Sequence, residues 1–224
     1  TANNVNSSKV TFTIDTLKPT FSWVDPTPAD GTKTTSTSVY LNTTITDATQ
    51  TSAWYDWNKS LVGYWSMDVR NSTGVYDNSS YANFGTATGG AVFNSSGVYG
   101  GAYTFDGVND GISAGNSSSL NPSSAMTLSA WINIKSTNTN YGVIFSRWGP
   151  PGGTAYWVST DINNPQVIVI YLSNLLVYTT PAFPLNEWVY FVATYNGTSA
   201  SAYKNGVYLG GAGNIASISP SLAV

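Results

Sequence analysis

The chain has 224 residues, a formal charge of −3 and neither histidine nor cysteine; charged residues make up 8% of it and aromatic residues 14%. Zinc, copper and haem sites use histidine or cysteine ligands, and disulfides, thiol nucleophiles and Ser-His-Asp triads need one of these residues, so all are excluded. With only eight Lys and Arg residues, nucleic acid is not an expected partner, because the phosphate backbone binds a basic face.

Short runs of alternating β-branched and aromatic residues along the first 60 residues predict β-strands. Val10, Phe12 and Ile14 alternate with threonines, and further strands are expected at 21–24 and 38–46. Turn-forming Pro, Gly and Asp residues separate these runs, as between consecutive strands. No helical period of 3.6 residues lasts three turns, so we expect no substantial helix.

From Leu61 onward the predicted strands become longer and glycine more frequent. The Asn205-Gly206 pair favours a type I′ turn between two strands, since both residues tolerate a positive φ. Strands at this spacing predict an all-β sandwich. The expected strands are 62–67, 101–105, 126–134, 141–147, 155–160, 166–172, 175–179, 188–195, 200–204 and 207–209.

Several stretches in a fixed order carry a resemblance to a known family. They include Leu-Val-Gly-Tyr-Trp-Ser-Met-Asp at 61–68, Tyr-Gly-Gly-Ala-Tyr-Thr-Phe-Asp-Gly at 99–107 and Trp-Val-Tyr-Phe-Val-Ala-Thr-Tyr-Asn-Gly at 188–197. Over about residues 61–215 the chain resembles the laminin-G-like, concanavalin-A-like jelly rolls of extracellular proteins. Two departures are a missing final Ile-Asp-Glu-Val-like strand and a loop at 79–81 without its usual glycine.

Residues 19–60 resemble the first half of the immunoglobulin-like modules of surface proteins. Only three strands are visible there, too few to close a sandwich. The expected fold is therefore an antiparallel jelly-roll sandwich plus a partial immunoglobulin-like β-sandwich module, which the jelly roll either adjoins or is inserted in. Residues 1–18 are expected to form a strand of a preceding module or an exchanged strand, residues 19–60 the partial module, and residues 61–224 the jelly roll without its last strand. No signal peptide is visible and the chain begins with Thr1, so we expect it to be cut from something longer.

Catalysis by carboxylates is the enzymatic chemistry that the composition leaves open, and we do not expect it. Glycoside hydrolysis needs two carboxylates about 5 to 9 Å apart. The glucanases that share the resembled fold carry a Glu-x-Asp-x-x-Glu strand, which has no counterpart here. Glu187, the only glutamate, stands where a turn residue precedes a strand, so no catalytic residue is predicted.

Calcium is the cofactor that the resemblance implies, held at the rim of the sandwich. Calcium takes six to eight oxygen ligands, several of them anionic. The candidate ligands in the resembled loops are Asp77, Asn83, Asp106 and Asp110. The alternative is that Asp106-Gly107 and its neighbours only form turns, their side chains bonding to their own backbone.

The aromatic residues divide into expected core and expected surface. Trp65, Trp131 and Trp188 lie in alternating strands and are expected in the core. Trp148 precedes a run of Gly and Pro residues and is expected on a loop, where its ring can stack on a sugar. The predicted carbohydrate patch is Tyr141, Trp148, Tyr156 and Trp157, and the alternative is that these rings pack beneath the loop.

Serine, threonine and asparagine contribute 29, 28 and 22 residues, a surface composition common outside cells. The longest apolar run, residues 167–172, is far shorter than the roughly 20 residues needed to span a membrane. Eight Asn-x-Ser/Thr sites occur where composition alone gives about five, so glycosylation is expected at some of them. They are Asn6, Asn42, Asn58, Asn71, Asn78, Asn94, Asn116 and Asn196.

These observations predict a non-enzymatic surface or adhesion protein segment, extracellular or at the cell surface. Its expected partner is a glycan or a surface protein, with calcium as a candidate cofactor. The alternative is a structural subunit of a surface filament, sheath or layer. Copies would then join by β-strand exchange through Val10, Phe12 and Ile14, because an unpaired strand completes an open sheet edge.

Overall fold

A computed structural model describes residues 19–47, 56, 59–135, 141–149, 153–215 and 218, with the backbone alone at 148–149 and 153–154. The chain divides into two compact units, Thr1–Asn58 and Lys59–Val224. The expected division into residues 1–18, 19–60 and 61–224 stays a prediction. No helix in the described ranges is long and apolar enough to cross a membrane.

The described part of the first unit contains one antiparallel strand pair, β1 (Thr20–Val24) and β2 (Asn42–Thr46). Phe21 lies opposite Ile45 and Trp23 opposite Thr43, so these side chains share one face. The rings of Phe21 and Trp23 meet edge to face at 5.0 Å, and each side chain is 50% exposed. The expected strand through Val10, Phe12 and Ile14 lies outside the described residues.

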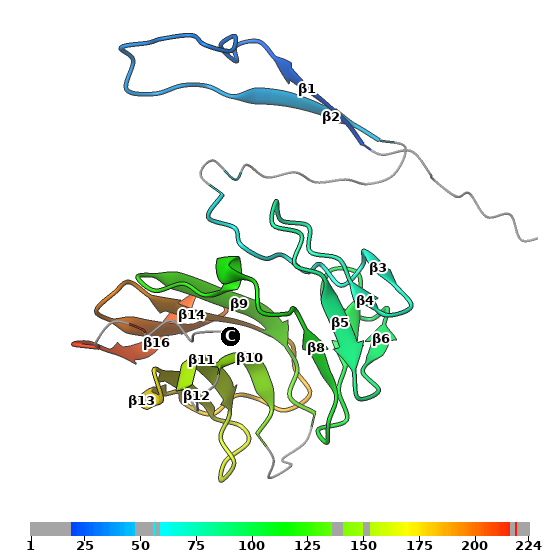
Figure 1. Ribbon diagram of the computed structural model, residues 1–224, viewed down its shortest axis with the longest axis vertical. Helices are drawn as coiled ribbons and strands as arrows, with labels where there is room; N and C mark the ends of the chain where they lie inside the picture. The colour runs from blue at the N-terminus through cyan, green and yellow to red at the C-terminus, as the bar shows by residue number, and fades with distance from the viewer. Residues whose placement is uncertain are drawn as a thin grey trace, which may run out of the picture. The chain divides into compact units, whose positions relative to one another are not determined.

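Two four-stranded antiparallel sheets form two layers in the second unit (Figure 1). The first sheet has the order β16-β15-β14-β9, with β9 (Met126–Ile132), β14 (Val189–Tyr195), β15 (Ala200–Lys204) and β16 (Val207–Ala212). The second has the order β10-β11-β12-β13, with β10 (Val143–Gly149), β11 (Gly153–Thr160), β12 (Ile168–Leu172) and β13 (Leu175–Thr179).

The core between the layers is built from the inward faces of both sheets. Val158, Ile168 and Ile170 from the second sheet form one buried cluster with Val189, Phe191, Ala193 and Ala202 from the first, and with Phe183 of the β13–β14 connection. This cluster follows directly from the period-2 alternation of strands. The predicted all-β antiparallel sandwich is confirmed.

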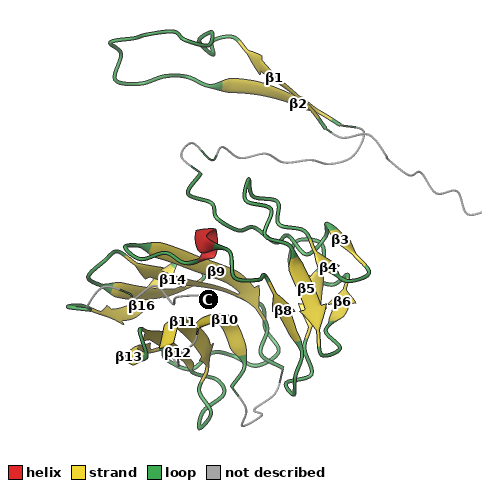
Figure 2. Ribbon diagram, in the orientation of Figure 1, coloured by secondary structure: helices red, strands yellow, loops and turns green. Residues whose placement is uncertain are grey.

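Shorter strands extend the unit beside the two layers (Figure 2). One sheet has the order β3-β4-β5-β8, with β3 (Arg70–Asn71), β4 (Gly74–Val75), β5 (Gly85–Thr88) and β8 (Gly111–Ser113). A separate pair joins β6 (Val92–Asn94) to β7 (Ala102–Thr104). A single 3-10 turn, η1 (Ser118–Leu120), precedes β9.

Most strands predicted in the second unit are present, with ends that move by a few residues. Asn205 and Gly206 have φ angles of 50° and 82° between β15 and β16, so the predicted hairpin turn is confirmed. The expected strand at 62–67 is wrong, because side chains hold this segment in place of a strand ladder. The Tyr64 amide donates to Asp77 Oδ1 at 2.7 Å, and the indole N–H of Trp65 donates to the Asn83 carbonyl at 2.8 Å.

The tryptophan expectation is wrong for Trp131. Its side chain is 39% exposed, whereas Trp65 and Trp188 are partly buried. On β9 the residues Met126, Leu128, Ala130 and Ile132 are less exposed than the alternating Thr127, Ser129 and Trp131. Trp131 therefore lies on the outward face of its sheet, away from the core.

Candidate ligand-binding surfaces

Asp77 ties three backbone segments together with its buried carboxylate. The carboxylate accepts hydrogen bonds from the amides of Tyr64 at 2.7 Å and of Ser79 and Asn83 at 2.8 Å each, and from the Ser79 hydroxyl at 2.8 Å. Burial by itself raises the pKa of Asp77, but these hydrogen bonds outweigh it and leave the pKa below its ordinary value. Each carboxylate oxygen accepts two hydrogen bonds, so the Asp77 side chain stabilises the backbone around it.

Asp106 and Asp110 lie together in the turn before β8. The Asp106 amide donates to Asp110 Oδ2 and the Val108 amide donates to Asp106 Oδ1, each at 2.8 Å. These contacts are the turn-forming bonds that the sequence left open as an alternative to calcium. Asp110 Oδ1 is buried without a hydrogen-bond partner.

The four candidate calcium ligands thus fall into two groups, one around Asp77 and Asn83 and one around Asp106 and Asp110. In the part of the chain that the structure describes, no three acidic side chains lie together in a way that could hold a metal ion. Because calcium needs several anionic oxygens among six to eight ligands, these residues do not fit a single calcium site. Calcium binding stays a prediction from the resemblance.

The predicted carbohydrate patch on β10 and β11 is only partly assembled. Tyr141 is 48% exposed and meets Trp157 edge to face at 6.1 Å, and the Trp157 indole N–H donates to the Ser159 hydroxyl at 2.7 Å. Tyr156, only 8% exposed, belongs to the core, and its hydroxyl donates to the Leu120 carbonyl at 3.2 Å. Burial raises the pKa of Tyr156, despite the opposing charge of Arg147.

Tyr156 was therefore wrongly assigned to a ligand-binding surface, because alternate residues of β11 face opposite sides of the sheet. The expectation that Trp148 lies on a loop is wrong, because its backbone belongs to β10 and pairs with Thr154 of β11. The side chain of Trp148 lies outside the described residues. The patch that the structure supports consists of Tyr141 and Trp157, one edge-to-face pair.

A larger exposed aromatic group lies on the other sheet, where the sequence prediction placed core. The ring of Trp131 on β9 lies 5.3 Å from that of Tyr190 on β14, and 6.0 Å from that of Tyr99 in the β6–β7 loop. Tyr99 is 76% exposed, and Tyr190 is partly buried. We call Tyr99, Trp131 and Tyr190 the aromatic platform.

One sequence signal pointed to this platform. Trp131 shares its strand face with Thr127 and Ser129, both exposed, and a face that carries two polar residues is usually turned to solvent. Tyr99 had no such signal, because its contact with Trp131 joins a loop to a strand far away in sequence.

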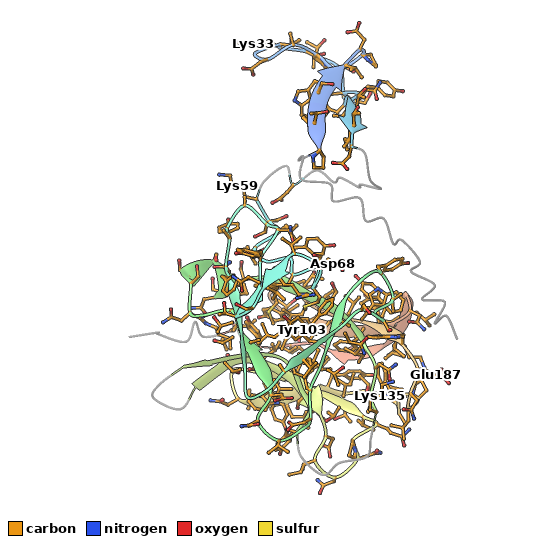
Figure 3. All side chains as sticks on the ribbon, turned by 90° about the vertical axis from the view of Figure 1, so that its right-hand side faces the viewer. Lys33, Lys59, Asp68, Tyr103, Lys135 and Glu187 are labelled. Atoms are coloured by element: carbon orange, nitrogen blue, oxygen red, sulfur yellow. The ribbon has the colours of Figure 1, made fainter. Side chains whose placement is uncertain are left out.

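Glu187 and the glycosylation sites that fall in the described residues are at the surface. Glu187 is exposed in the turn before β14, at the edge of the unit in Figure 3. Six of the eight predicted glycosylation asparagines lie in the described ranges and all six are exposed: Asn42, Asn71, Asn78, Asn94, Asn116 and Asn196. Asn6 and Asn58 lie outside the described residues. Their glycosylation stays a prediction.

Comparison with known proteins gives one match. A family model described as the concanavalin A-like lectin/glucanases superfamily matches residues 106–221, just over half of the chain. The matched range contains Trp131 and Tyr190 and the two sheets that form the layers, β16-β15-β14-β9 and β10-β11-β12-β13. A search of curated proteins and a search of solved structures found no significant match.

Proposed function

The chain belongs to the concanavalin A-like lectin/glucanases superfamily, and on that premise we propose that it is a non-enzymatic extracellular surface segment that binds carbohydrate through its aromatic platform. One observation carries the proposal: on the outward side of the first sheet the exposed ring of Trp131 contacts both the exposed ring of Tyr99 and the partly buried ring of Tyr190. An exposed aromatic group of this kind marks an interaction site more often than a single exposed ring does.

The platform has the chemistry that a sugar needs. An aromatic face covers the apolar C–H face of a pyranose, while neighbouring hydroxyl and amide groups bond to its hydroxyls. The exposed hydroxyls of Thr127 and Ser129 lie on the same strand face as Trp131. Rings and hydroxyls are thus presented together on one surface.

Binding rather than hydrolysis is supported by the acidic residues. The superfamily name covers both lectins and glucanases, so the family alone does not decide between them. The sequence lacks a Glu-x-Asp-x-x-Glu strand, and its one glutamate, Glu187, is exposed in a turn. The neutral surface rich in Ser, Thr and Asn supports an extracellular location, and an adhesive role follows from glycan binding there.

Replacing Trp131 by alanine is expected to abolish glycan binding on a glycan array, or to weaken it at least about tenfold. The ring lies at the centre of the platform, in contact with both Tyr99 and Tyr190. Tyr141→Ala is the matched control, because it removes an exposed ring from the other sheet. If Trp131→Ala still binds on the array and Tyr141→Ala does not, the proposal is wrong and the binding site lies beside the second sheet.

A structural role is the second candidate, and the first unit favours it. Its described part, residues 19–47 and 56, contains a two-stranded sheet and no fully buried side chain. Phe21 and Trp23 remain half exposed on one face. Two strands rarely form a stable sheet alone, so a strand contributed by another copy would complete this unit.

Phe12→Asp is expected to dissociate assemblies of this second kind into monomers, as measured by light scattering after size-exclusion chromatography. The charge would enter the apolar face that Phe12 shares with Val10 and Ile14 in the sequence, and burying it is unfavourable. Thr11→Asp is the control, since it changes the alternate face of the same strand. A wild-type chain that stays monomeric at every concentration would contradict the structural role.

A further inference from the structure

We propose that the aromatic platform continues across the whole first sheet, and that this outward face binds a linear, uncharged oligosaccharide laid across its four strands. The inference rests on the proposed carbohydrate-binding function and specifies its ligand. It adds a second aromatic pair, Tyr203 and Tyr208, to the three residues of the platform.

Strand register places the two aromatic groups on one face. Trp131 lies directly opposite Tyr190, and Tyr208 opposite Tyr203. Val192 connects the two pairs, because it follows Tyr190 by two residues on β14 and lies opposite Tyr203 on β15. Residues directly opposite each other, or two apart on one strand, point to the same side of a sheet.

The residues that face the core confirm that the aromatic pairs lie on the outward side of the first sheet. Phe191 lies opposite Ala130 and Lys204, and it is fully buried in the core between the sheets. The alternating Tyr190 and Val192 therefore point outward. The Lys204 ammonium lies 5.6 Å from the ring of Phe183, a core residue, so its charge belongs to the inward side.

Exposure and ring contact make Tyr203 and Tyr208 a second stacking position. Their ring centroids lie 5.5 Å apart, tilted by 59°. Tyr208 is 60% exposed, and Tyr203 is partly buried. The two groups thus offer rings on β9 and β14 at one side of the sheet and on β15 and β16 at the other.

The width of this face favours an extended chain over a single sugar. Four adjacent strands are separated by three spacings of about 4.8 Å, so the face is about 14 Å across from β9 to β16. One pyranose ring covers one aromatic group and leaves the other exposed. A linear oligosaccharide that crosses the strands reaches both groups with successive sugar units.

The absence of charge selects a neutral ligand. In these four strands, all within the described residues, the outward positions are aromatic or aliphatic residues, serine, threonine or glycine: Thr127, Ser129, Trp131, Tyr190, Val192, Thr194, Ser201, Tyr203, Tyr208 and Gly211. A uronic acid or sialic acid would lose hydration here without gaining an arginine or lysine partner. The interspersed hydroxyls also suit a sugar better than an apolar protein surface.

The test is isothermal titration calorimetry of the whole chain with neutral gluco-, manno-, galacto- and xylo-oligosaccharides, from disaccharide to hexasaccharide, and with oligogalacturonides as the acidic series. We expect at least one neutral series to bind, with Kd falling at least about tenfold between disaccharide and hexasaccharide. Tyr208→Ala is expected to remove this gain with length while keeping the disaccharide affinity. Trp131→Ala is expected to weaken every member of the series.

Val207→Ala is the matched control, an exposed residue next to Tyr208 that lies opposite Lys204 and so on the other side of the strand. Equal affinity for disaccharide and hexasaccharide, with Trp131→Ala still impaired, would overturn the inference and leave the proposed function standing. Preference for oligogalacturonides, or a wild-type dimer that Tyr208→Ala dissociates, would also overturn it. Binding to no neutral series would reject both proposals.

Discussion

Phe191→Ala is expected to lower the free energy of unfolding of the second unit by about 3 to 5 kcal/mol. Phe191 is 0% exposed in the middle of β14, and its ring meets that of Phe183 at 6.1 Å and 67°. Removal of the ring deletes its own buried surface and leaves a cavity against Phe183. Urea unfolding followed by tryptophan fluorescence measures the loss.

Thr194→Ala serves as the control on the same strand, because Thr194 occupies an outward position only partly buried. Its effect is expected to stay within about 0.5 kcal/mol. The m-value is the slope of the free energy of unfolding against urea concentration. If both variants keep the wild-type m-value, the change in midpoint reports a change in stability and not in the compactness of either state. A loss below about 1 kcal/mol in Phe191→Ala would mean that Phe191 is not at the centre of the core.

The strands were predictable from sequence because their signal is local. On β14 the alternation of Val189, Phe191 and Ala193 with Tyr190 and Val192 is visible in the sequence and matches the buried and partly buried positions. The turn at residues 205–206 is equally local, since two neighbouring residues supply its positive φ angles.

The strand expected at 62–67 could not be tested against local sequence patterns, because distant residues determine the structure of this segment. Its alternating residues fit a strand, but its hydrogen bonds go to scattered groups of residues 77–83 and form no ladder. The Tyr64 amide donates to the Asp77 carboxylate and the Trp65 indole to the Asn83 carbonyl, 13 and 18 residues along the chain, and the Tyr64 carbonyl accepts from the Asn78 amide. No pattern within the segment reveals that a side chain takes the place of a neighbouring strand.

The candidate site was harder to predict than the fold for a related reason. Alternation separates the two faces of a strand, but it does not say which face of an aromatic-rich strand is covered. Tyr156 was assigned outward and lies in the core, whereas Trp131 was assigned inward and is 39% exposed. On β11 the neighbouring Tyr156 and Trp157 made the two faces resemble each other, whereas on β9 the polar Thr127 and Ser129 beside Trp131 already indicated an outward face.

The low content of charged residues in the chain is matched by the absence of charge on the outward face of the first sheet. With 8% charged residues in the whole chain, a sheet face whose outward residues carry no charge is an expected consequence. Such a face attracts no ions over long distances, and its affinity has to come from stacking and hydrogen bonds. Glycan binding by the first sheet should therefore depend only weakly on salt.

Asp77→Asn is expected to lower the free energy of unfolding at neutral pH by about 2 to 3 kcal/mol. The variant removes the negative charge that four hydrogen bonds stabilise. If the remaining Oδ1 keeps its two donors, the new NH₂ group replaces Oδ2 and faces the Asn83 N–H, so that two donors meet without an acceptor. Urea unfolding at neutral pH measures this loss. Glu187→Gln, an exposed carboxylate in the same unit, is the control and is expected to change stability by less than about 0.5 kcal/mol.

The same carboxylate predicts how the difference depends on pH. Hydrogen bonding, which outweighs burial, holds the pKa of Asp77 in the folded state below its ordinary value. Its stabilisation is therefore fully present above the unfolded pKa of about 3.9 and is lost as the pH falls through that value toward the lower folded pKa. The stability gap between wild type and Asp77→Asn should shrink over this acidic range, because protonation makes the wild-type group neutral as well. A gap that stays constant from neutral to acidic pH would show that the charge of Asp77 does not stabilise the loop.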